Sequence, residues 1–358
     1  MEIYPGILIT TSVVCTFILT VIISRVVIPI LKSHKMGQKI LDIGPRWHKS
    51  KEGTPTMGGI AFIFAMTVVI AADIAVIAFL KGTVPMALVL TFVYALLCAF
   101  IGCIDDTAKL KRRQNEGLTP LQKLIFQIVI ASAYIFALVY FGCIGDTVYI
   151  PYLGITIEHA GIVYYPFLVF LAVGMMNSVN LADGIDGLCA TETLIVAAFF
   201  VIAGVVRYAM PGGGVLDISG VTILPEDGFA EQIASLGAVV AGGMLGFLVY
   251  NFHPARVFMG DTGSLFLGGI VMGGALMLNN PIIVIVYGLM YIIETLSDII
   301  QVTYFKISGG KRIFRMAPIH HHFEKCGWGE IKIVVVFSIM TAIFCAVAYL
   351  GLPPWGTV

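Results

Sequence analysis

The chain has 358 residues, of which 21 are basic and 21 acidic, so its formal net charge is zero. Hydrophobic residues make up 59% of it and charged residues 12%, about half the charged share that is usual in soluble domains. With a mean hydropathy of +0.98, this composition excludes a soluble globular protein, and the zero net charge argues against a nucleic-acid partner. The sequence therefore predicts an integral membrane protein.

Apolar runs of membrane-spanning length recur along the whole chain. A transmembrane helix needs about 20 mostly apolar residues, and the runs predict an all-α protein with ten transmembrane helices in a single polytopic domain, 1–358. One charge-free stretch is divided at Asn279-Asn280-Pro281. The first run has no small-residue cleavage site and is expected to be a retained helix. The expected spans are 7–30, 57–79, 84–104, 122–141, 161–179, 188–206, 232–251, 264–278, 282–305 and 332–351.

Basic residues concentrate in the loops that follow odd-numbered spans. The opposite loops hold little beyond Lys81 and Arg207. By the positive-inside rule the basic loops face the cytoplasm, and both termini are extracytoplasmic. The cytoplasmic cations are Lys32, Lys35, Lys39, Arg46, Lys49, Lys51, Lys109, Lys111, Arg112, Arg113, Lys123, Arg256, Lys306, Lys311, Arg312, Arg315, Lys325 and Lys332.

Five aspartates fall in three of these cytoplasmic loops, each near the end of a predicted helix. Converging carboxylates suit a hard cation such as Mg²⁺, which leaves ligand positions for phosphate oxygens, and neighbouring lysines can hold the remaining phosphate charge. The alternative is that solvated carboxylates merely balance nearby lysines. All five together favour a phosphate and Mg²⁺ site on the cytoplasmic face. They are Asp105, Asp106, Asp183, Asp186 and Asp261.

The acidic residues of the first two of these loops suggest different chemistry. Asp105 and Asp106 are adjacent, which suits one as a metal ligand or metal-orienting group and the other as a general base. Asn180, Asp183 and Asp186 recur every three residues, so in a helical turn they would share one side and could read the ring and ribose of a nucleotide. The D-G pairs in this segment allow close backbone approach. An Asx-capped turn between two helices is the structural alternative.

Two further loops contain candidate binding residues. Asp261 is placed to cap the helix that follows it, and the N-terminus of that helix attracts phosphate. Phe258 is an apolar side chain in a polar loop, suited to stacking on a base or to anchoring the loop at the bilayer interface. Three consecutive histidines, 320–322, can bind phosphate as imidazolium, bind metal or move protons. A zinc site is not expected there, because adjacent histidines do not easily reach one ion.

Two features of the spans have mainly structural interpretations. The pairs Gly242/Gly246 and Gly269/Gly273 are typical of close helix packing, and glycine-rich faces also allow a homodimer. Glu294, Asp298 and Gln301 follow one face of a span. Because such groups are costly in lipid, we expect this face to line a cavity or to contact other helices.

In this order, the motifs resemble the polyprenyl-phosphate N-acetylhexosamine-1-phosphate transferase superfamily, and within it the bacterial cell-wall branch. The A-P-x-H-H-H-x-E form favours that branch over the N-acetylglucosamine branches. The resemblance covers essentially the whole chain. The matching segments are Pro55-Thr56-Met57-Gly58-Gly59, Asp105-Asp106, Asn180 to Gly187, Phe258 to Ser264 and His320-His321-His322.

The resemblance implies a reaction and a location. Undecaprenyl phosphate would attack UDP-N-acetylmuramoyl-pentapeptide to give lipid I and UMP, with Mg²⁺ required. The enzyme would lie in the bacterial inner membrane, with its active site facing the cytoplasm. A sibling transferring N-acetylglucosamine 1-phosphate is one alternative. An ion-coupled transporter is another, although its ionisable residues would be expected near the bilayer midplane and its halves repeated.

The resemblance also implies residue roles. Asp261 would be the Mg²⁺ ligand, and Asp105 and Asp106 the catalytic pair, one of them deprotonating the lipid phosphate. Lys123, Asn251 and His320 would lie near the diphosphate. The remaining positions match a uridine and nucleotide pocket, with Phe258 stacking on uracil. These are Lys51, Asn180, Asp183, Gly184, Asp186 and Phe258.

Overall fold

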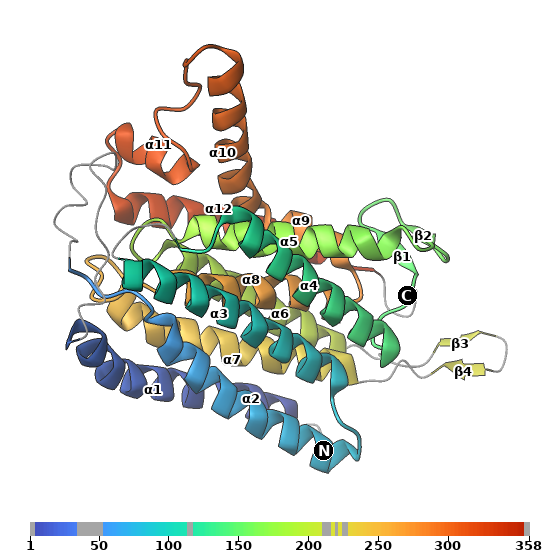
Figure 1. Ribbon diagram of the computed structural model, residues 1–358. Helices are drawn as coiled ribbons and strands as arrows, with labels where there is room; N and C mark the ends of the chain where they lie inside the picture. Colours follow the sequence, from blue (N-terminus) through green and yellow to red (C-terminus); the bar gives the residue numbers. More distant parts are fainter. Residues whose placement is uncertain are drawn as a thin grey trace.

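The computed structural model describes residues 4–33, 53–112, 117–209, 216–218, 221–223 and 228–353, and these form a mainly helical protein. The long helices run side by side, with two short hairpins at one end of the bundle (Figure 1). The elements are α1 (Tyr4–Ser33), α2 (Gly59–Lys81), α3 (Met86–Arg112), α4 (Pro120–Tyr140), β1 (Val148–Ile150), β2 (Ile155–Ile157), α5 (Tyr164–Ala182), α6 (Leu188–Ala209), β3 (Leu216–Ile218), β4 (Val221–Ile223), α7 (Gly228–Asn251), α8 (Gly260–Met277), a 3₁₀ helix (Pro281–Ile283), α9 (Val284–Tyr287), α10 (Leu289–Ile307), α11 (Ile319–Lys325) and α12 (Glu330–Leu350).

Eight helices in the described segments are long and apolar enough to cross a membrane. The bent pair Pro281–Tyr287 and Leu289–Ile307 makes a ninth if it is counted as one span. The predicted division after the eighth apolar run is confirmed, because α8 ends at Met277 and the next helix begins at Pro281. The expected span 282–305 is broken in the structure: the chain bends by 77° at Gly288, and α10 projects away from the bundle (Figure 1).

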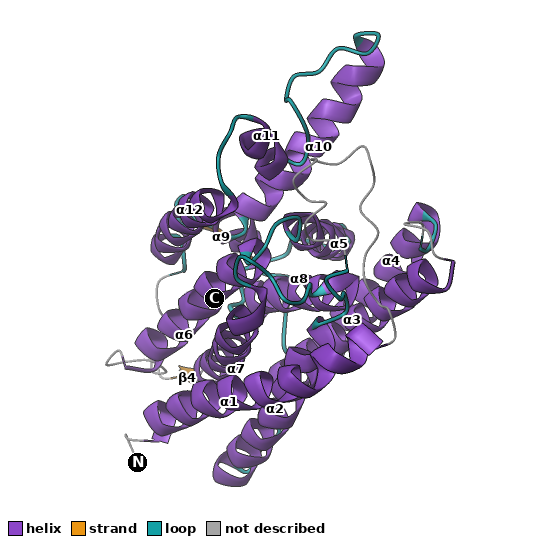
Figure 2. Ribbon diagram, turned by 90° about the vertical axis from the view of Figure 1, so that its left-hand side faces the viewer, coloured by secondary structure: helices purple, strands orange, loops and turns teal. Residues whose placement is uncertain are grey.

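Helices α7 and α8 form the centre of the bundle. In the view along the helices they are enclosed by the others (Figure 2), with α1 and α6 against α7, and α3 and α5 against α8. Every residue of α8 from Thr262 to Met277 is buried. This arrangement encloses α8 and brings its first turn, at Gly260, beside the ends of α3 and α5.

The predicted glycine pairs are sites of close packing within this chain. A Cβ on Gly246 would come within 2.8 Å of the Phe17 carbonyl oxygen of α1, and one on Gly269 would come within 3.1 Å of Ala95 Cα of α3. Small residues let helix backbones approach closely where apolar burial alone gives no preference between lipid and protein. Because α1 and α3 already cover these faces, the faces carry no argument for a homodimer.

One buried acid inside a span was not singled out in the sequence. Asp73 lies in α2 and is only 4% exposed. The hydroxyls of Ser12 and Ser235, from α1 and α7, lie 2.8 and 2.7 Å from Asp73 Oδ2. The carboxyl thus faces two neighbouring helices rather than lipid, which makes a polar group at this depth tolerable.

Candidate active site

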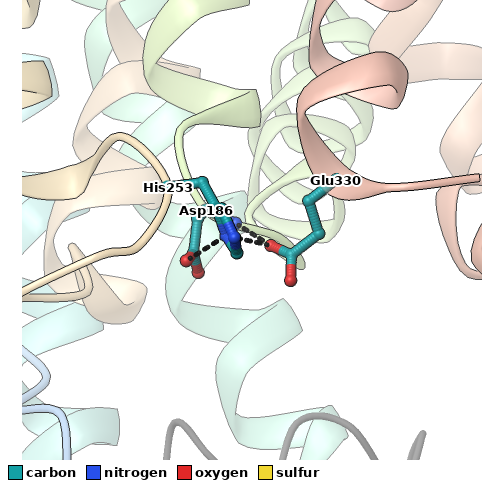
Figure 3. A group of neighbouring side chains, drawn as sticks. All are labelled: Asp186, His253 and Glu330. Atoms are coloured by element: carbon teal, nitrogen blue, oxygen red, sulfur yellow. Dashed lines mark hydrogen bonds and ion pairs between the residues drawn. The ribbon is translucent and has the colours of Figure 1, made fainter.

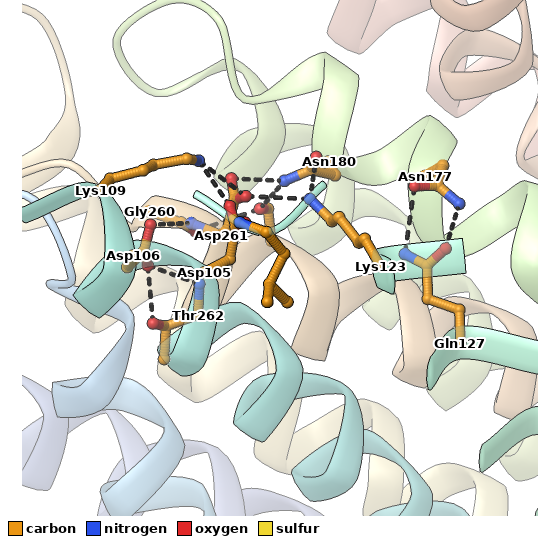
Figure 4. Close-up of polar contacts among 12 residues, drawn as sticks. Asp105, Asp106, Lys109, Lys123, Gln127, Asn177, Asn180, Gly260, Asp261 and Thr262 are labelled. Atoms are coloured by element: carbon orange, nitrogen blue, oxygen red, sulfur yellow. Dashed lines mark hydrogen bonds and ion pairs between the residues drawn. The ribbon is translucent and has the colours of Figure 1, made fainter. Parts of the chain in front are cut away.

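Asp261, in the first turn of α8, is the centre of a polar cluster (Figure 4). Lys109 Nζ and Lys123 Nζ donate to its Oδ2 at 3.0 and 2.9 Å, and Asn180 Nδ2 donates to its Oδ1 at 3.0 Å. The donors come from α3, α4 and α5, respectively. Three helices therefore deliver one side chain each to a single carboxylate, as the predicted convergence of the cytoplasmic loops requires.

The surroundings of Asp261 keep it ionised. Burial by itself would raise the pKa of this carboxyl. A hydrogen bond with Asp105 and the positive charges of Lys123 and Lys109 outweigh that effect and hold the pKa well below its ordinary value. An ionised aspartate with charged neighbours is suited to holding a hard cation or to orienting lysines toward phosphate.

Asp106 caps the N-terminus of α8 from the neighbouring helix. Its Oδ1 accepts a hydrogen bond from Asp261 N at 3.2 Å, and its Oδ2 accepts from Thr262 N at 2.9 Å and Thr262 Oγ1 at 2.7 Å. The sequence predicted this capping role for Asp261, and that prediction is wrong. The close approach of α3, where a Cβ on Gly102 would overlap the Asp261 carbonyl, brings Asp106 to the free N–H groups instead.

Asp105, next to Asp106, faces the lysines. Its Oδ2 lies 2.7 Å from Lys109 Nζ, and its Oδ1 accepts a hydrogen bond from Leu118 N at 2.7 Å. Lys109 therefore bridges the carboxylates of Asp105 and Asp261. The two adjacent aspartates differ in environment: Asp106 accepts hydrogen bonds from the first turn of α8, whereas Asp105 lies beside the ammonium group of Lys109.

An amide pair beside the cluster was missed in the sequence. Gln127 Nε2 donates to Asn177 Oδ1 at 3.1 Å, and Asn177 Nδ2 donates back to Gln127 Oε1 at 2.8 Å (Figure 4). Gln127 lies one helical turn after Lys123, and Asn177 lies one turn before Asn180. The pair thus joins α4 to α5 at the level where both helices reach Asp261. The sequence feature that could have indicated this pair is the presence of two amide side chains inside otherwise apolar spans.

The loop between α5 and α6 contains the second group of predicted residues. Helix α5 ends at Ala182, and Gly187 has a φ of +79°, a value that suits glycine. Asn180 therefore faces Asp261 from the helix, whereas Asp186 lies beyond the helix end and has other partners. The expectation that these residues share one helical face is wrong. Burial raises the pKa of the Asp183 carboxyl well above its ordinary value, and nearby carboxylates, Asp261 foremost, raise it further.

Asp186, His253 and Glu330 form a second cluster (Figure 3). Asp186 Oδ2 lies 3.1 Å from His253 Nδ1 and accepts a hydrogen bond from Ala255 N at 2.9 Å, while Asp186 N donates to Glu330 Oε2 at 3.2 Å. The three ligand atoms lie within 4.8 Å of one another, as a metal site would need. However, they already bind one another and backbone, so the cluster's evident role is to join the α5–α6 loop, the α7–α8 loop and α12.

Phe258 and Asn251 shape the loop before α8. Asn251 is buried, and its Nδ2 donates to the Val257 carbonyl at 2.9 Å, so its side chain holds the loop itself. Phe258 is half-buried. Its N–H donates to the Pro55 carbonyl at 2.8 Å, and its carbonyl accepts from Gly58 N at 2.8 Å. The loop thereby pairs with the segment that precedes α2. Lys51 lies outside the described residues.

The three consecutive histidines have three different environments. His320 is fully buried, with Nδ1 3.0 Å from Glu294 Oε2. His321 Nδ1 lies 2.6 Å from Glu324 Oε2, and His322 Nδ1 accepts a hydrogen bond from Arg315 N at 3.0 Å. They do not form one metal site. Glu294 of the predicted polar stripe faces the protein, as expected.

Comparisons with known proteins identify the family of this chain. Residues 88–279 match the family described as glycosyl transferase family 4, and residues 51–63 match the first phospho-N-acetylmuramoyl-pentapeptide-transferase signature. The chain is similar to the phospho-N-acetylmuramoyl-pentapeptide-transferase of Clostridium acetobutylicum, with 43% identity over 95% of this chain and 98% of the relative. It is also similar to the phospho-N-acetylmuramoyl-pentapeptide-transferase of Clostridium perfringens strain 13, with 41% identity over 96% of this chain and 98% of the relative.

The chain belongs to the phospho-N-acetylmuramoyl-pentapeptide-transferase family. Within this transferase, the 88–279 match contains the whole Asp261 cluster, whereas His320 lies beyond it. The described part of the signature segment lies directly against the start of α8, since Gly59 N donates to the Met259 carbonyl at 3.0 Å. The signature and the aspartate motifs of the transferase thus lie at one place in the fold.

Proposed function

We propose that this chain transfers phospho-N-acetylmuramoyl-pentapeptide from UDP-N-acetylmuramoyl-pentapeptide to undecaprenyl phosphate, giving lipid I and UMP. The observation that carries the proposal is the Asp261 cluster, with two lysines and a second carboxylate at the helix ends of a membrane bundle. One substrate is soluble and the other is anchored in the bilayer, so the site must lie at the membrane interface.

In the proposed reaction, an oxygen of the lipid phosphate attacks the β-phosphorus of the nucleotide sugar. The bond from that phosphorus to the bridging oxygen breaks, and UMP leaves with the oxygen. Phosphoryl transfer needs mainly charge neutralisation and in-line positioning. Lys109 and Lys123 supply positive charge for the phosphates. Asp105 is the better candidate for the base that deprotonates the lipid phosphate, because it lies among the lysines beside Asp261, whereas Asp106 accepts its hydrogen bonds from the first turn of α8.

Magnesium is the proposed cofactor. The carboxylates of Asp261 and Asp105 adjoin, and two lysine ammonium groups lie on them. A site whose ligand atoms are all carboxylate oxygens, and whose negative charge calls for nearby positive charge, fits a hard divalent cation. Asp261, with Asp105 beside it, would hold the ion, which when bound would neutralise charge on the diphosphate. The Asp186 cluster fits less well, because it includes the imidazole of His253, whereas Mg²⁺ prefers oxygen ligands.

The nucleotide pocket is proposed from Lys51, Phe258 and the α5–α6 loop. Phe258 would stack on uracil, while Asn180, Asp183 and Gly184 would line the ribose and diphosphate. Asp186 and Asn251 are proposed to act by holding their loops, since their side chains are bound to backbone in the described structure. Asp106, too, would contribute by fixing α8, and His320 would lie near the diphosphate.

The proposed topology has ten spans in one domain, both termini outside and the site at the cytoplasmic face of the bacterial inner membrane. The tenth span would be the buried 264–278 segment, in addition to the eight helices and the bent pair. Support comes from the bundle itself: the start of α1 and the end of α12 lie at the end with the hairpins (Figure 1), whereas the Asp261 cluster is formed near the C-terminal ends of α3 and α5 and the first turns of α4 and α8. A homodimer lacks support from the glycine faces.

Purified protein incubated with UDP-N-acetylmuramoyl-pentapeptide, undecaprenyl phosphate and MgCl₂ should release UMP, and omission of the lipid or addition of EDTA should stop the release. An N-acetylglucosamine sibling would instead retain label from UDP-N-acetylglucosamine in the lipid fraction, and that result would overturn the proposal. Release of UMP without lipid by Asp105→Asn would contradict direct attack. The transporter alternative predicts no UMP at all.

A further inference from the structure

Glu294 and His320 form a buried pair behind the α5–α6 loop. Glu294 comes from α10 and His320 from α11, and both are 0% exposed. Glu294 Oε2 lies 3.0 Å from His320 Nδ1 and also accepts a hydrogen bond from His320 N at 3.4 Å. One carboxylate oxygen therefore fixes both the ring and the backbone of the histidine.

The other ring nitrogen has no such partner. His320 Nε2 is buried and makes no hydrogen bond within the described segments. It faces Gly184, because a Cβ built on that glycine would overlap Nε2. A buried polar atom without a partner is costly, and native structures keep few of them without a use. This one points at the Asp183-Gly184 turn, where the donor nucleotide is proposed to bind.

We propose that Glu294 is a positioning residue: it holds the Nδ1–H of His320 and thereby directs Nε2 toward the Asp183-Gly184 turn, where Nε2–H donates to a phosphate oxygen of the donor substrate. This inference rests on the proposed function. A carboxylate on one nitrogen fixes the ring's orientation and compensates the positive charge that the ring carries when both nitrogens hold protons. Gly184 is required because any side chain would occupy the space that Nε2 faces.

The first test reads the ring directly. Nitrogen-15 NMR of histidine-labelled protein in nanodiscs, with His320→Gln to assign the signal, should show His320 with a proton on Nδ1. In Glu294→Gln the Nδ1 signal should move, because the amide can turn its NH₂ group toward that nitrogen. A wild-type ring that carries its proton on Nε2 alone would overturn the proposal, and this reading needs no substrate.

The second test is kinetic. Glu294→Gln should lower kcat/KM by about 10- to 100-fold, by analogy with the loss that follows removal of the hydrogen-bond partner behind a metal-binding histidine. In a His320→Gln background the same change should have no further effect, since Glu294 acts through that ring. Thr295→Val is the matched control: it removes the neighbouring hydrogen bond from Thr295 Oγ1 to Ser178 Oγ, 2.8 Å long, and should keep the wild-type rate within about twofold.

The outcomes separate this inference from the proposed function. If wild-type protein releases no UMP, the proposed function fails. If wild type is active and Glu294→Gln matches it, or if the losses from Glu294→Gln and His320→Gln multiply in the double variant, only the positioning role of Glu294 fails. An equal loss in Thr295→Val would mean that any change in α10 harms the enzyme, and would also overturn that role.

Discussion

Replacing Asp106 by asparagine should weaken both the fold and the activity. The asparagine keeps one acceptor oxygen for the N-terminus of α8, where the aspartate now accepts three hydrogen bonds from Asp261 and Thr262. Charge-assisted hydrogen bonds contribute about 1.5–3 kcal/mol each, and the loss of charge at a helix N-terminus adds up to about 1 kcal/mol. With partial compensation by the remaining oxygen, we expect about 2–4 kcal/mol of destabilisation, or roughly 3–5 °C in unfolding temperature for a chain of this length.

Asp105→Asn is the matched control, because it changes the adjacent residue on the same helix. It loses the ion pair to Lys109 but leaves the α8 cap intact, so its unfolding temperature should stay within about 2 °C of wild type while UMP release falls. Tryptophan fluorescence during heating in detergent gives the unfolding temperature, and UMP release gives the activity. An Asp106→Asn variant that unfolds with wild type yet is inactive would refute the capping argument and assign Asp106 to the chemistry.

Three further predictions concern packing and charge. Gln127→Ala and Asn177→Ala should each lower the free energy of unfolding, and the double variant should lose less than the sum, with a coupling energy of about 1–2 kcal/mol. Additive losses would mean that the amide pair does not join α4 to α5. Gly59→Ala should lower the free energy of unfolding by about 1–3 kcal/mol, because the new Cβ would overlap the backbone of α8. Gly6→Ala should not lower it, because a Cβ there meets nothing within 4 Å. Equal effects of the two changes would contradict the close packing at Gly59. For Asp183, the folded pKa is raised, so wild-type protein without ligand should lose stability as pH rises through that pKa, while Asp183→Asn should lose less; parallel pH profiles of unfolding temperature would contradict this.

The helices were largely predictable because lipid imposes a length and an apolar composition on each span. Hydropathy also located the break at Pro281, where an asparagine pair and a proline interrupt the run. The bend at Gly288 could not be found in the same way, because it lies inside a charge-free stretch in which straight and bent helices have the same hydropathy. The buried Asp73 shows the converse: its partners lie on two other helices, and only the fold brings them together.

The candidate site was predictable as a group but not contact by contact. Loops on one membrane face lie near one another, so the meeting of Asp105, Asp106 and Asp261 followed from their positions, whereas Asp186 joined a different cluster. Which carboxylate caps α8 depends on how closely α3 approaches it, and that approach is a property of packing at Gly102 and Gly260 rather than of the D-D motif. Gln127 and Asn177 are unremarkable singly, and their reciprocal bonding appears only once α4 and α5 lie side by side.

The most direct measurement compares wild type with Asp261→Asn for transfer of radiolabelled phospho-N-acetylmuramoyl-pentapeptide from the UDP donor to undecaprenyl phosphate. We expect labelled lipid from wild type and a loss of at least about 10²-fold in the variant, as for removal of a group that stabilises a transition state. Thermal unfolding of both proteins shows that the variant is folded. Absence of labelled lipid from wild type, or wild-type transfer by a folded Asp261→Asn variant, would contradict the account.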